Sequence, residues 1–448
     1  MHPPGAAQDA GTRAITASLV YQDGRFREGL AVVVEEDRIA AVTPRAALGS
    51  LRVEDWGEVA LMPGTVNAHG HAFQNLLKGF ADDRPFESWR DDVLYPFSER
   101  LSRDDVYTGA LFAFTEALLA GATTTVDFFY LHDASNDNAR AVLDAARDCG
   151  IRLVLARAFY DPDAPTKAPA RYREPAAEAA ARLKDLAAET AGEPLVSVQP
   201  APHSLHAASP DTIAAALACA GDLGVPCHLH LAEARYEVEQ VRRRYGTTPV
   251  RLLAREGLLS ERLVTIHTVW ADDEELDLLA ASGAGVVHCP GANAFLGDGI
   301  ARVPEMLRRG IRVALGPDGG CANNRQSVFD EMRQATLMAK ARLTDGSALG
   351  AAAAFELGTR RGGELLGLPV GEVSPGRHAD LVALDLTDLS LQPLATLEYQ
   401  IVSSMQPTAI ARVMVGGRVV VERGRPQLVD VAELRARIAA VTARWTRP

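Results

Sequence analysis

The chain has 448 residues, of which 47% are hydrophobic, which allows one large domain with a sizeable core and a smaller companion domain. Its formal net charge is −12 and its Lys and Arg residues form no basic run. This composition argues against nucleic acids and anionic membranes as partners.

The cysteines point to a reducing compartment. All five are scattered and none forms a CxxC pair, which argues against a disulfide framework and a zinc ribbon. The first residues, MHPPGAAQDAGTRA, lack a charged start followed by an apolar core, and no apolar run reaches the ~20 residues of a membrane helix. We therefore expect a cytoplasmic protein.

Both ends of the chain are rich in short β-branched runs separated by turns. Residues 15–45 are typical of hairpins, and the pattern returns in GRHADLVALDL and ARVMVGGRVVVERGRP near the C-terminus. In the second of these segments, Gly416-Gly417 predicts a two-residue turn. The strands of the two ends could pair in one small sheet.

The middle of the chain alternates strand-like runs with Ala- and Leu-rich helical segments, which indicates a (β/α)8 barrel. The eight strand candidates are residues 58–69, 121–130, 151–161, 195–203, 225–233, 263–270, 283–290 and 311–318. In such a barrel the reactive residues lie at the C-terminal ends of the strands.

The first candidate strand ends in His69-Gly70-His71. Residues i and i+2 of an extended strand point the same way, so the two imidazoles can bind one ion. Alone the pair is weak evidence, because buried histidines that are hydrogen-bonded to a carbonyl are common.

Later strand ends add further polar residues. In the fifth strand, CHLHLAE, we favour His230 over His228 as a ligand, and Glu233 stands beyond it in a position that suits a general acid/base. Asp318 ends the eighth strand, where it would complete a ligand set that leaves an open position for water. Asp-Gly is, however, also a common turn.

The four lysines, Lys78, Lys167, Lys184 and Lys340, do not fall at the end of the fourth strand, where a two-metal site would need a bridging ligand. The sequence therefore predicts a single metal ion. His203 and His267, at the ends of the fourth and sixth strands, remain free to contact substrate or move protons.

These motifs together resemble the amidohydrolase superfamily, in the branch of the cytosine/adenosine deaminases and triazine hydrolases. The matching segments are PGTVNAHGH, APHS, HLHLAE, TIHTVWADDEE, HCPGANAFLGDGIARVPEML, ALGPDGGCANNRQSVFDEMR and GEVSPGRHADLVALD. The resemblance implies a hydrolytic deaminase that releases ammonia from a purine, pyrimidine, pterin or triazine derivative through a metal-activated hydroxide.

The resemblance also implies roles for individual residues. His69, His71, His230 and Asp318 would hold one divalent ion, most often zinc, with iron as the other option. Glu233 would protonate the ring nitrogen beside the attacked carbon, His267 would steer the water, and protons would pass through Glu233, His267 and Asp318. His203 would contact the substrate.

Further candidate substrate contacts lie outside the predicted strand ends. In the segment after the first strand we expect Gln74 and Trp89 to contact the substrate, with Trp89 stacking on a flat ring, and Arg157 to reach a polar group. Phe73, Phe86, Glu87, Asn293 and Asn324 are further candidates. Ordinary packing or turn formation would explain each of these residues equally well.

Two alternatives to a ring deaminase remain. HAFQ and FFYLHD also resemble N-formimino-L-glutamate deiminase, and the same scaffold can remove halide or an alkylamine. A catalytically inactive scaffold is the third class, but every proposed ligand is present.

The fold expected from these observations is α/β. Residues 64–372 would form a TIM-like barrel, and residues 1–63 and 373–448 a small β-sandwich domain with a terminal helix. We expect a small-molecule substrate and a homo-oligomer, either a dimer or a tetramer.

Overall fold

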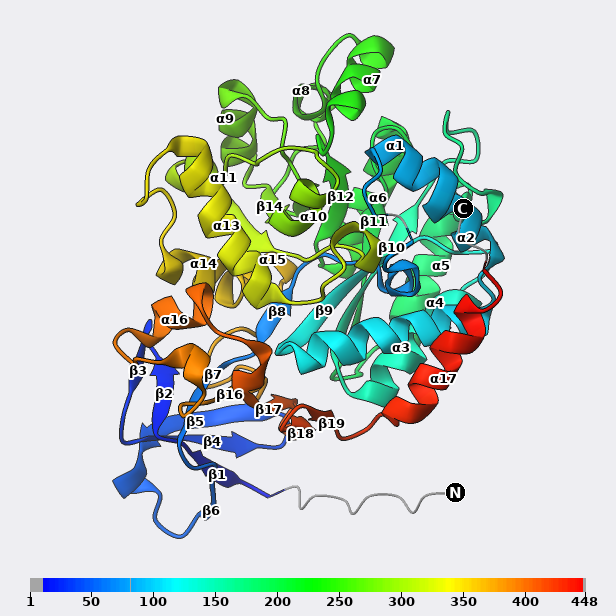
Figure 1. Cartoon of the computed structure of the whole chain (residues 1–448). Coiled ribbons are helices and arrows are strands. Elements are labelled where there is room, and N and C mark those ends of the chain that lie inside the picture. Colours follow the sequence, from blue (N-terminus) through cyan, green and yellow to red (C-terminus); the bar gives the residue numbers. More distant parts are fainter. Residues whose placement is uncertain (1–10, 81, 446–448) are drawn as a thin grey trace.

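The structure is a computed structural model that describes residues 11–80 and 82–445 (Figure 1). Most of the N-terminal stretch that was considered for a leader, residues 1–10, lies outside the described residues, as do residues 81 and 446–448.

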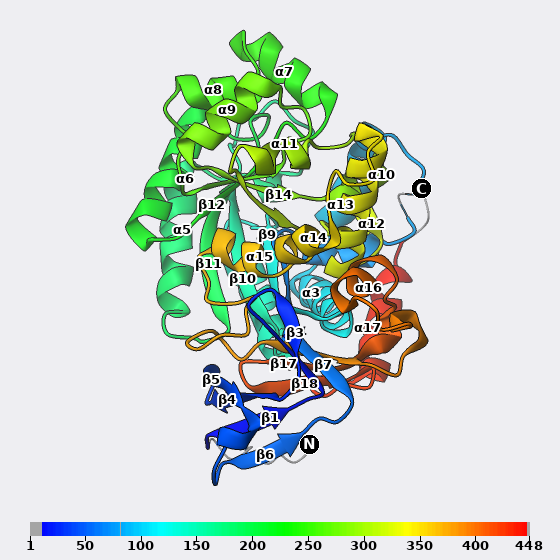
Figure 2. The same ribbon diagram turned by 90° about the vertical axis from the view of Figure 1, so that its left-hand side faces the viewer.

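The middle of the chain forms two parallel four-stranded sheets, with the orders β11-β10-β9-β8 and β12-β13-β14-β15 (Figures 1 and 2). Backbone hydrogen bonds link the outer strands of the two sheets, from His230 N to His203 O (3.1 Å) and from Ala68 N to Leu315 O (3.0 Å). The strands are β8 (Thr65–Asn67), β9 (Ala122–Phe129), β10 (Arg152–Phe159), β11 (Val196–Pro202), β12 (Cys227–Leu231), β13 (Leu263–His267), β14 (Gly285–His288) and β15 (Arg312–Leu315).

Helices follow these strands along the chain and cover them. Every residue of β9 and of β10 is buried, as expected for parallel strands covered on both faces. The helices are α1 (Phe86–Ser88), α2 (Tyr95–Arg100), α3 (Arg103–Leu119), α4 (Asp137–Cys149), α5 (Ala176–Glu189), α6 (Pro210–Leu223), α7 (Arg235–Tyr245), α8 (Pro249–Arg255), α9 (Asp273–Ser282), α10 (Pro290–Phe295), α11 (Val303–Arg308), α12 (Gly320–Asn323), α13 (Val328–Leu343), α14 (Ala351–Leu357), α15 (Arg360–Leu366), α16 (Leu397–Ser403) and α17 (Val431–Thr442).

The two ends of the chain meet in two further sheets, seen at the bottom of Figures 1 and 2. Their orders are β5-β4-β1-β6 and β19-β18-β17-β16-β7-β2-β3. N-terminal and C-terminal strands pair directly, because β16 runs antiparallel to β7. These strands are β1 (Arg13–Thr16), β2 (Leu19–Gln22), β3 (Arg25–Arg27), β4 (Leu30–Glu35), β5 (Arg38–Pro44), β6 (Arg52–Asp55), β7 (Val59–Pro63), β16 (Leu381–Asp385), β17 (Ile410–Val415), β18 (Arg418–Glu422) and β19 (Arg425–Pro426).

Two predictions made from the sequence can be compared directly with the structure of the terminal strands. The Gly416-Gly417 turn is confirmed: Val415 pairs with Arg418, and both glycines have positive φ, +52° and +75°. The single strand expected over residues 58–69 is wrong, because the chain divides there into β7, which joins the terminal sheet, and β8, which joins a parallel sheet.

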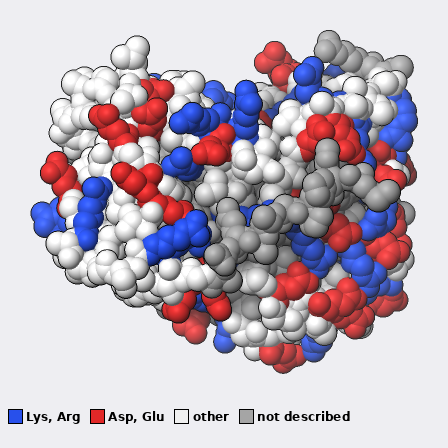
Figure 3. All heavy atoms as spheres, turned by 90° about the horizontal axis from the view of Figure 1, so that it is seen from below, with Lys and Arg blue, Asp and Glu red and all other residues white. Residues whose placement is uncertain are grey.

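Acidic and basic side chains are interspersed on the face that carries the terminal sheets (Figure 3). Among the described residues, the helices are too short or too polar to cross a lipid bilayer.

Candidate metal centre and active site

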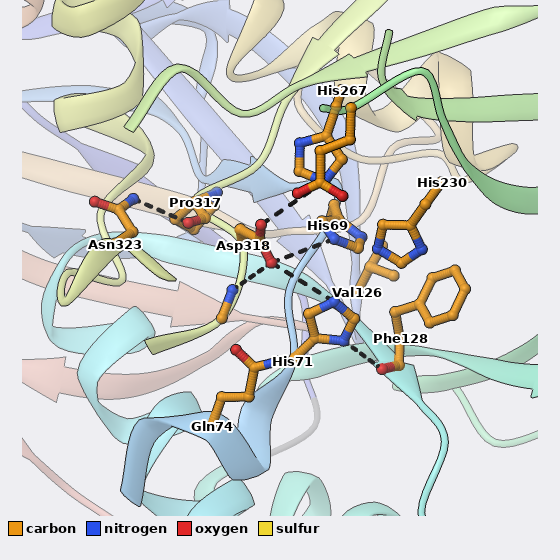
Figure 4. A network of polar contacts seen from close by, with 12 residues as sticks. His69, His71, Gln74, Val126, Phe128, His230, His267, Pro317, Asp318 and Asn323 are labelled. Atoms are coloured by element: carbon orange, nitrogen blue, oxygen red, sulfur yellow. Dashed lines mark hydrogen bonds and ion pairs between the residues drawn. The ribbon is translucent and has the colours of Figure 1, made fainter. Parts of the chain in front are cut away.

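The predicted ligands converge from both parallel sheets (Figure 4). His69 and His71 follow β8, His230 lies in β12 and Asp318 follows β15. The ligand atoms of the three histidines lie within 4.8 Å of one another. Asp318 Oδ1 lies 3.5 Å from His69 Nε2 and 3.6 Å from His71 Nε2. Three imidazoles and one carboxylate therefore face a common point, as in catalytic zinc sites.

Hydrogen bonds to Nδ1 fix the orientation and the tautomer of two of these histidines. His71 Nδ1 lies 2.7 Å from Phe128 O, and His230 Nδ1 lies 2.9 Å from His203 O. A carbonyl can only accept, so each Nδ1 carries the proton and each Nε2 lone pair faces the cluster. This is the arrangement that metal-binding histidines need.

His69 provides the test of whether a cation fits. Its side chain is fully buried, and neither ring nitrogen has a hydrogen-bond partner among the described residues. A buried imidazole without a partner is costly, and a metal ion at this point would satisfy it. The residues present therefore fit a divalent ion.

The electrostatic surroundings keep the candidate ligands in the form that can bind a metal ion. Burial, followed by the neighbouring histidines His230 and His228, lowers the pKa of His69 well below its usual value. Burial likewise lowers the pKa of His71 and of His230. The imidazoles are therefore neutral near pH 7, and their lone pairs are available.

Glu233 and His267 lie beside the ligand cluster. His267 Nε2 is 3.5 Å from Glu233 Oε1 and 3.8 Å from Asp318 Oδ2. Burial first, and then the negative charges of Asp298, Asp318 and Glu237, raise the pKa of Glu233 well above its usual value. A carboxyl group whose pKa is raised in this way suits a general acid.

The backbone at these strand ends is in an unusual conformation. Ala232, His267, Thr268 and Asp318 all have positive φ, between +48° and +70°. Such conformations are unfavourable for residues with a Cβ, and they concentrate at functional sites where the surrounding fold imposes them.

A cavity opens beside the cluster. Its lining includes three of the candidate metal ligands, His71, His230 and Asp318, together with Glu233 and a group of aromatic side chains, here called the aromatic wall. The wall residues are Phe86, Trp89, Tyr95, Tyr130 and Tyr172. A hydrogen bond from Trp89 Nε1 to Cys321 O (2.9 Å) fixes the indole ring. Flat rings of this kind can stack on a heterocycle.

The structure brings most of the predicted substrate residues to this cavity. His203, Gln74 and Trp89 line it, and the Gln74 amide donates to the Tyr130 hydroxyl (2.9 Å). The structure does not bring Arg157 there. That side chain is fully buried, donates to Asn136 Oδ1 and forms an ion pair with Glu174, outside the cavity lining.

Several lining residues were not singled out from the sequence. Arg90 is the one Lys or Arg side chain among the described residues that line the cavity, and it lies between the rings of Phe86, Tyr95 and Tyr236. His206 also lines the cavity, three residues after His203. Of the residues missed, only Tyr130 carried a sequence signal, because it is the last residue of the second predicted strand.

Comparison with known proteins identifies a family and relatives that are similar to this chain over almost its full length. The model of the amidohydrolase family matches residues 60–420. A 5-methylthioadenosine/S-adenosylhomocysteine deaminase of Moorella thermoacetica is 33% identical over 415 residues, which is 91% of this chain and 93% of the relative. A 5′-deoxyadenosine deaminase of Methanothermobacter thermautotrophicus is 33% identical over 434 residues, or 95% of this chain and 97% of the relative.

Solved structures of similar proteins have the same fold as this chain. An adenosine deaminase of Xanthomonas campestris with bound zinc superposes with a TM-score of 0.88 at 29% identity, covering 97% of this chain and 98% of that one. The atrazine chlorohydrolase of Arthrobacter aurescens, complexed with zinc, has the same fold, with a TM-score of 0.88 at 24% identity over 96% of this chain and 99% of that one.

Proposed function

We propose that this chain, which belongs to the amidohydrolase family, deaminates the adenine ring of a 5′-substituted adenosine. At the coarser level the chain is a metal-dependent hydrolytic deaminase of an aminated heterocycle, acting on the C–N bond of a cyclic amidine. The choice of adenine rests on the deaminases of adenosine derivatives to which the chain is about one-third identical over almost its full length.

The observation that carries the assignment is the cluster of candidate metal ligands that lines an aromatic cavity, with the Glu233 carboxyl beside it. One divalent ion is the cofactor, and zinc is the ion bound in the similar adenosine deaminase. We propose that His69, His71, His230 and Asp318 hold it. When bound, the ion supplies a positive charge that lowers the pKa of water at this point.

We propose the following roles for the surrounding side chains. The aromatic wall, with Trp89, holds the ring so that its amino-bearing carbon faces the cluster. Glu233 donates a proton to the adjacent ring nitrogen, which makes this carbon more electrophilic. Water then adds to the carbon and gives one proton to Asp318, which passes it to the amino nitrogen. The C–N bond breaks, ammonia leaves, and the proton of the new hydroxyl group returns to Glu233 as the carbonyl forms. His203 and Gln74 contact the substrate.

We also propose the finer architecture. The two parallel sheets would close into one eight-stranded barrel over residues 64–372, supported by the hydrogen bonds at both pairs of outer strands. Residues 1–63 and 373–448 would form the β-sandwich domain, supported by a core shared between the two terminal sheets. All five cysteines are free and buried, which is consistent with the cytoplasm. We propose a homo-oligomeric assembly, a dimer or tetramer.

The test is ammonia release from a panel of adenosine derivatives, free purines, pyrimidines and pterins, together with metal analysis of the purified protein. We expect turnover of 5′-substituted adenosines and about one zinc per chain. Release of ammonia only from formimino compounds, or of halide or alkylamine, would overturn the proposal.

Glu233→Gln is the decisive variant. It keeps the shape of the side chain but removes the proton that the carboxyl donates, so we expect unchanged zinc content with kcat lower by roughly 10²–10⁴-fold. Zinc is measured by elemental analysis and kcat by ammonia release. Retained activity would show that Glu233 is not the proton donor.

A further inference from the structure

The Asn293 side chain contacts the outer edge of His267. Asn293 lies in α10 and is 1% exposed, and its Nδ2 atom is 3.0 Å from His267 Nδ1. This edge of the ring faces away from the cluster. Whatever binds Nδ1 decides which ring nitrogen carries the proton of the neutral imidazole.

Asp298 orients this amide. The Asp298 carboxyl lies beside the Asn293 side chain, and the Asp298 backbone N–H donates to Asn293 O at 2.9 Å. A carboxylate accepts hydrogen bonds, so it selects the NH₂ end of the amide. The same NH₂ group then has its second hydrogen for His267 Nδ1, while Asn293 Oδ1 has no partner among the described residues.

Asp298 is itself anchored from outside the cluster. Its backbone carbonyl accepts a hydrogen bond from Trp270 Nε1 at 2.9 Å, and the Arg235 guanidinium lies over the Trp270 ring at 4.3 Å. Gly299, the next residue, has φ +124° and leaves only 3.2 Å between an added Cβ and the Trp270 ring. The orientation of Asn293 is therefore built into the loop.

The contacts on the inner edge of His267 are a second, independent indication of which ring nitrogen carries the proton. Its Nε2 atom faces two carboxyl groups, Glu233 Oε1 at 3.5 Å and Asp318 Oδ2 at 3.8 Å. The Asp318 carboxylate attracts an N–H group and repels a lone pair, and the carbonyl oxygen of the Glu233 carboxyl can accept from the same N–H.

We propose that Asn293 is a positioning residue which, held by Asp298, keeps the proton of His267 on Nε2. His267 then acts in the proposed deamination as a hydrogen-bond donor that orients the attacking water, and not as its base. Proton transfer is left to Glu233 and Asp318. This inference rests on the proposed function for its role in turnover, but the proton position itself does not depend on the substrate.

The direct test is the tautomer of His267 in the zinc-loaded protein. Long-range ¹H–¹⁵N correlation spectra of ¹⁵N-histidine-labelled protein distinguish the protonated nitrogen from the lone-pair nitrogen of each ring. The His267 signals are assigned as those missing in His267→Gln. We expect the proton on Nε2, and a proton on Nδ1 would overturn the proposal whether or not the protein deaminates any heterocycle.

The exchange variant Asn293→Asp/Asp298→Asn tests the consequence for catalysis. It keeps the two side-chain types and the buried charge but places a carboxylate against His267 Nδ1, which draws the proton to that nitrogen. We expect the Nδ1–H tautomer, wild-type zinc content, and kcat lower by about 10–100-fold with little change in KM. Full kcat with the inverted tautomer would overturn the proposal, as would an Nε2–H tautomer in the exchange variant.

The chain offers a matched control. Asn324, a candidate substrate contact in the sequence, does not line the cavity and instead donates to Asp82 Oδ1 at 3.1 Å near the surface. The exchange Asn324→Asp/Asp82→Asn makes the same chemical change there, so the His267 tautomer and kcat should match the wild type. If the deaminase assay fails for every substrate while the tautomer follows Asn293 as expected, the proposed function fails and the tautomer assignment stands.

Discussion

At the scale of single residues, the position of His69 depends on a glycine far away in sequence. A Cβ added to Gly316 would lie 2.7 Å from His69 N and 2.8 Å from His69 O. These are backbone atoms, so rotation of a side chain cannot relieve the overlap. We expect Gly316→Ala to displace His69 and to weaken zinc binding by about 10–100-fold, measured by competition with a chelator. Gly346→Ala, where nothing lies within 4 Å, is the control, and equal zinc affinity in both variants would contradict this reasoning.

At this scale, the sequence could place a residue where its position along a strand is sufficient. His230 and Asp318 could be placed because a strand end is visible in the hydrophobic pattern. Arg157 could not, because all eight residues of β10 are buried and the pattern does not show which face meets the cavity. Arg90 was missed because its environment is made by Tyr95 and Tyr236, and such contacts between separate segments leave no local signal.

At the scale of elements, a buried ion pair connects the parallel and terminal sheets. Arg152 begins β10, and its Nε and Nη2 atoms lie 2.8 and 3.0 Å from the Asp380 carboxylate, next to β16. Both side chains are at most 3% exposed, and Asp380 also accepts from Gly416 N at 2.7 Å. The pair thus ties the first parallel sheet to two strands of the C-terminal region.

We expect Asp380→Ala to lower the free energy of unfolding by about 3–5 kcal/mol, because it leaves a buried guanidinium without its partner. The shift in the denaturant midpoint measures this. Removal of the exposed Arg437–Glu433 pair by Glu433→Ala should change stability by only about 0–1 kcal/mol. If the two variants were equally stable, the buried pair would not be a structural link.

At the scale of the whole molecule, the alternation of strands and helices and the family resemblance together predicted the α/β class and the cluster of ligands. The division of residues 58–69 between two sheets was not predictable, because β7 joins the terminal sheet through β16, more than 300 residues away, and only pairing partners distinguish it from β8. The hairpin at Gly416-Gly417 was predictable because its determinants are local.

The ligand cluster has a consequence for stability of the whole molecule. His69 and His71 follow β8 of one parallel sheet, whereas His230 and Asp318 belong to β12 and the end of β15 in the other. A metal ion held by all four therefore cross-links the two sheets in the native state, and the unfolded chain has no such site. An ion present at about 1,000 times its Kd would stabilise the native state by about 4 kcal/mol. Chelation should accordingly lower Tm by several degrees, and added zinc should restore it.

Two variants separate this stabilisation from catalysis. In Asp318→Ala the ligand set is incomplete, so chelation should shift Tm much less than in the wild type. Glu233→Gln keeps all four ligands, so it should retain the full shift although its turnover is lost. Differential scanning calorimetry with and without chelator measures both. If Asp318→Ala kept the full shift, the stabilising ion would lie elsewhere; if Glu233→Gln lost it, Glu233 would be a ligand and not the proton donor.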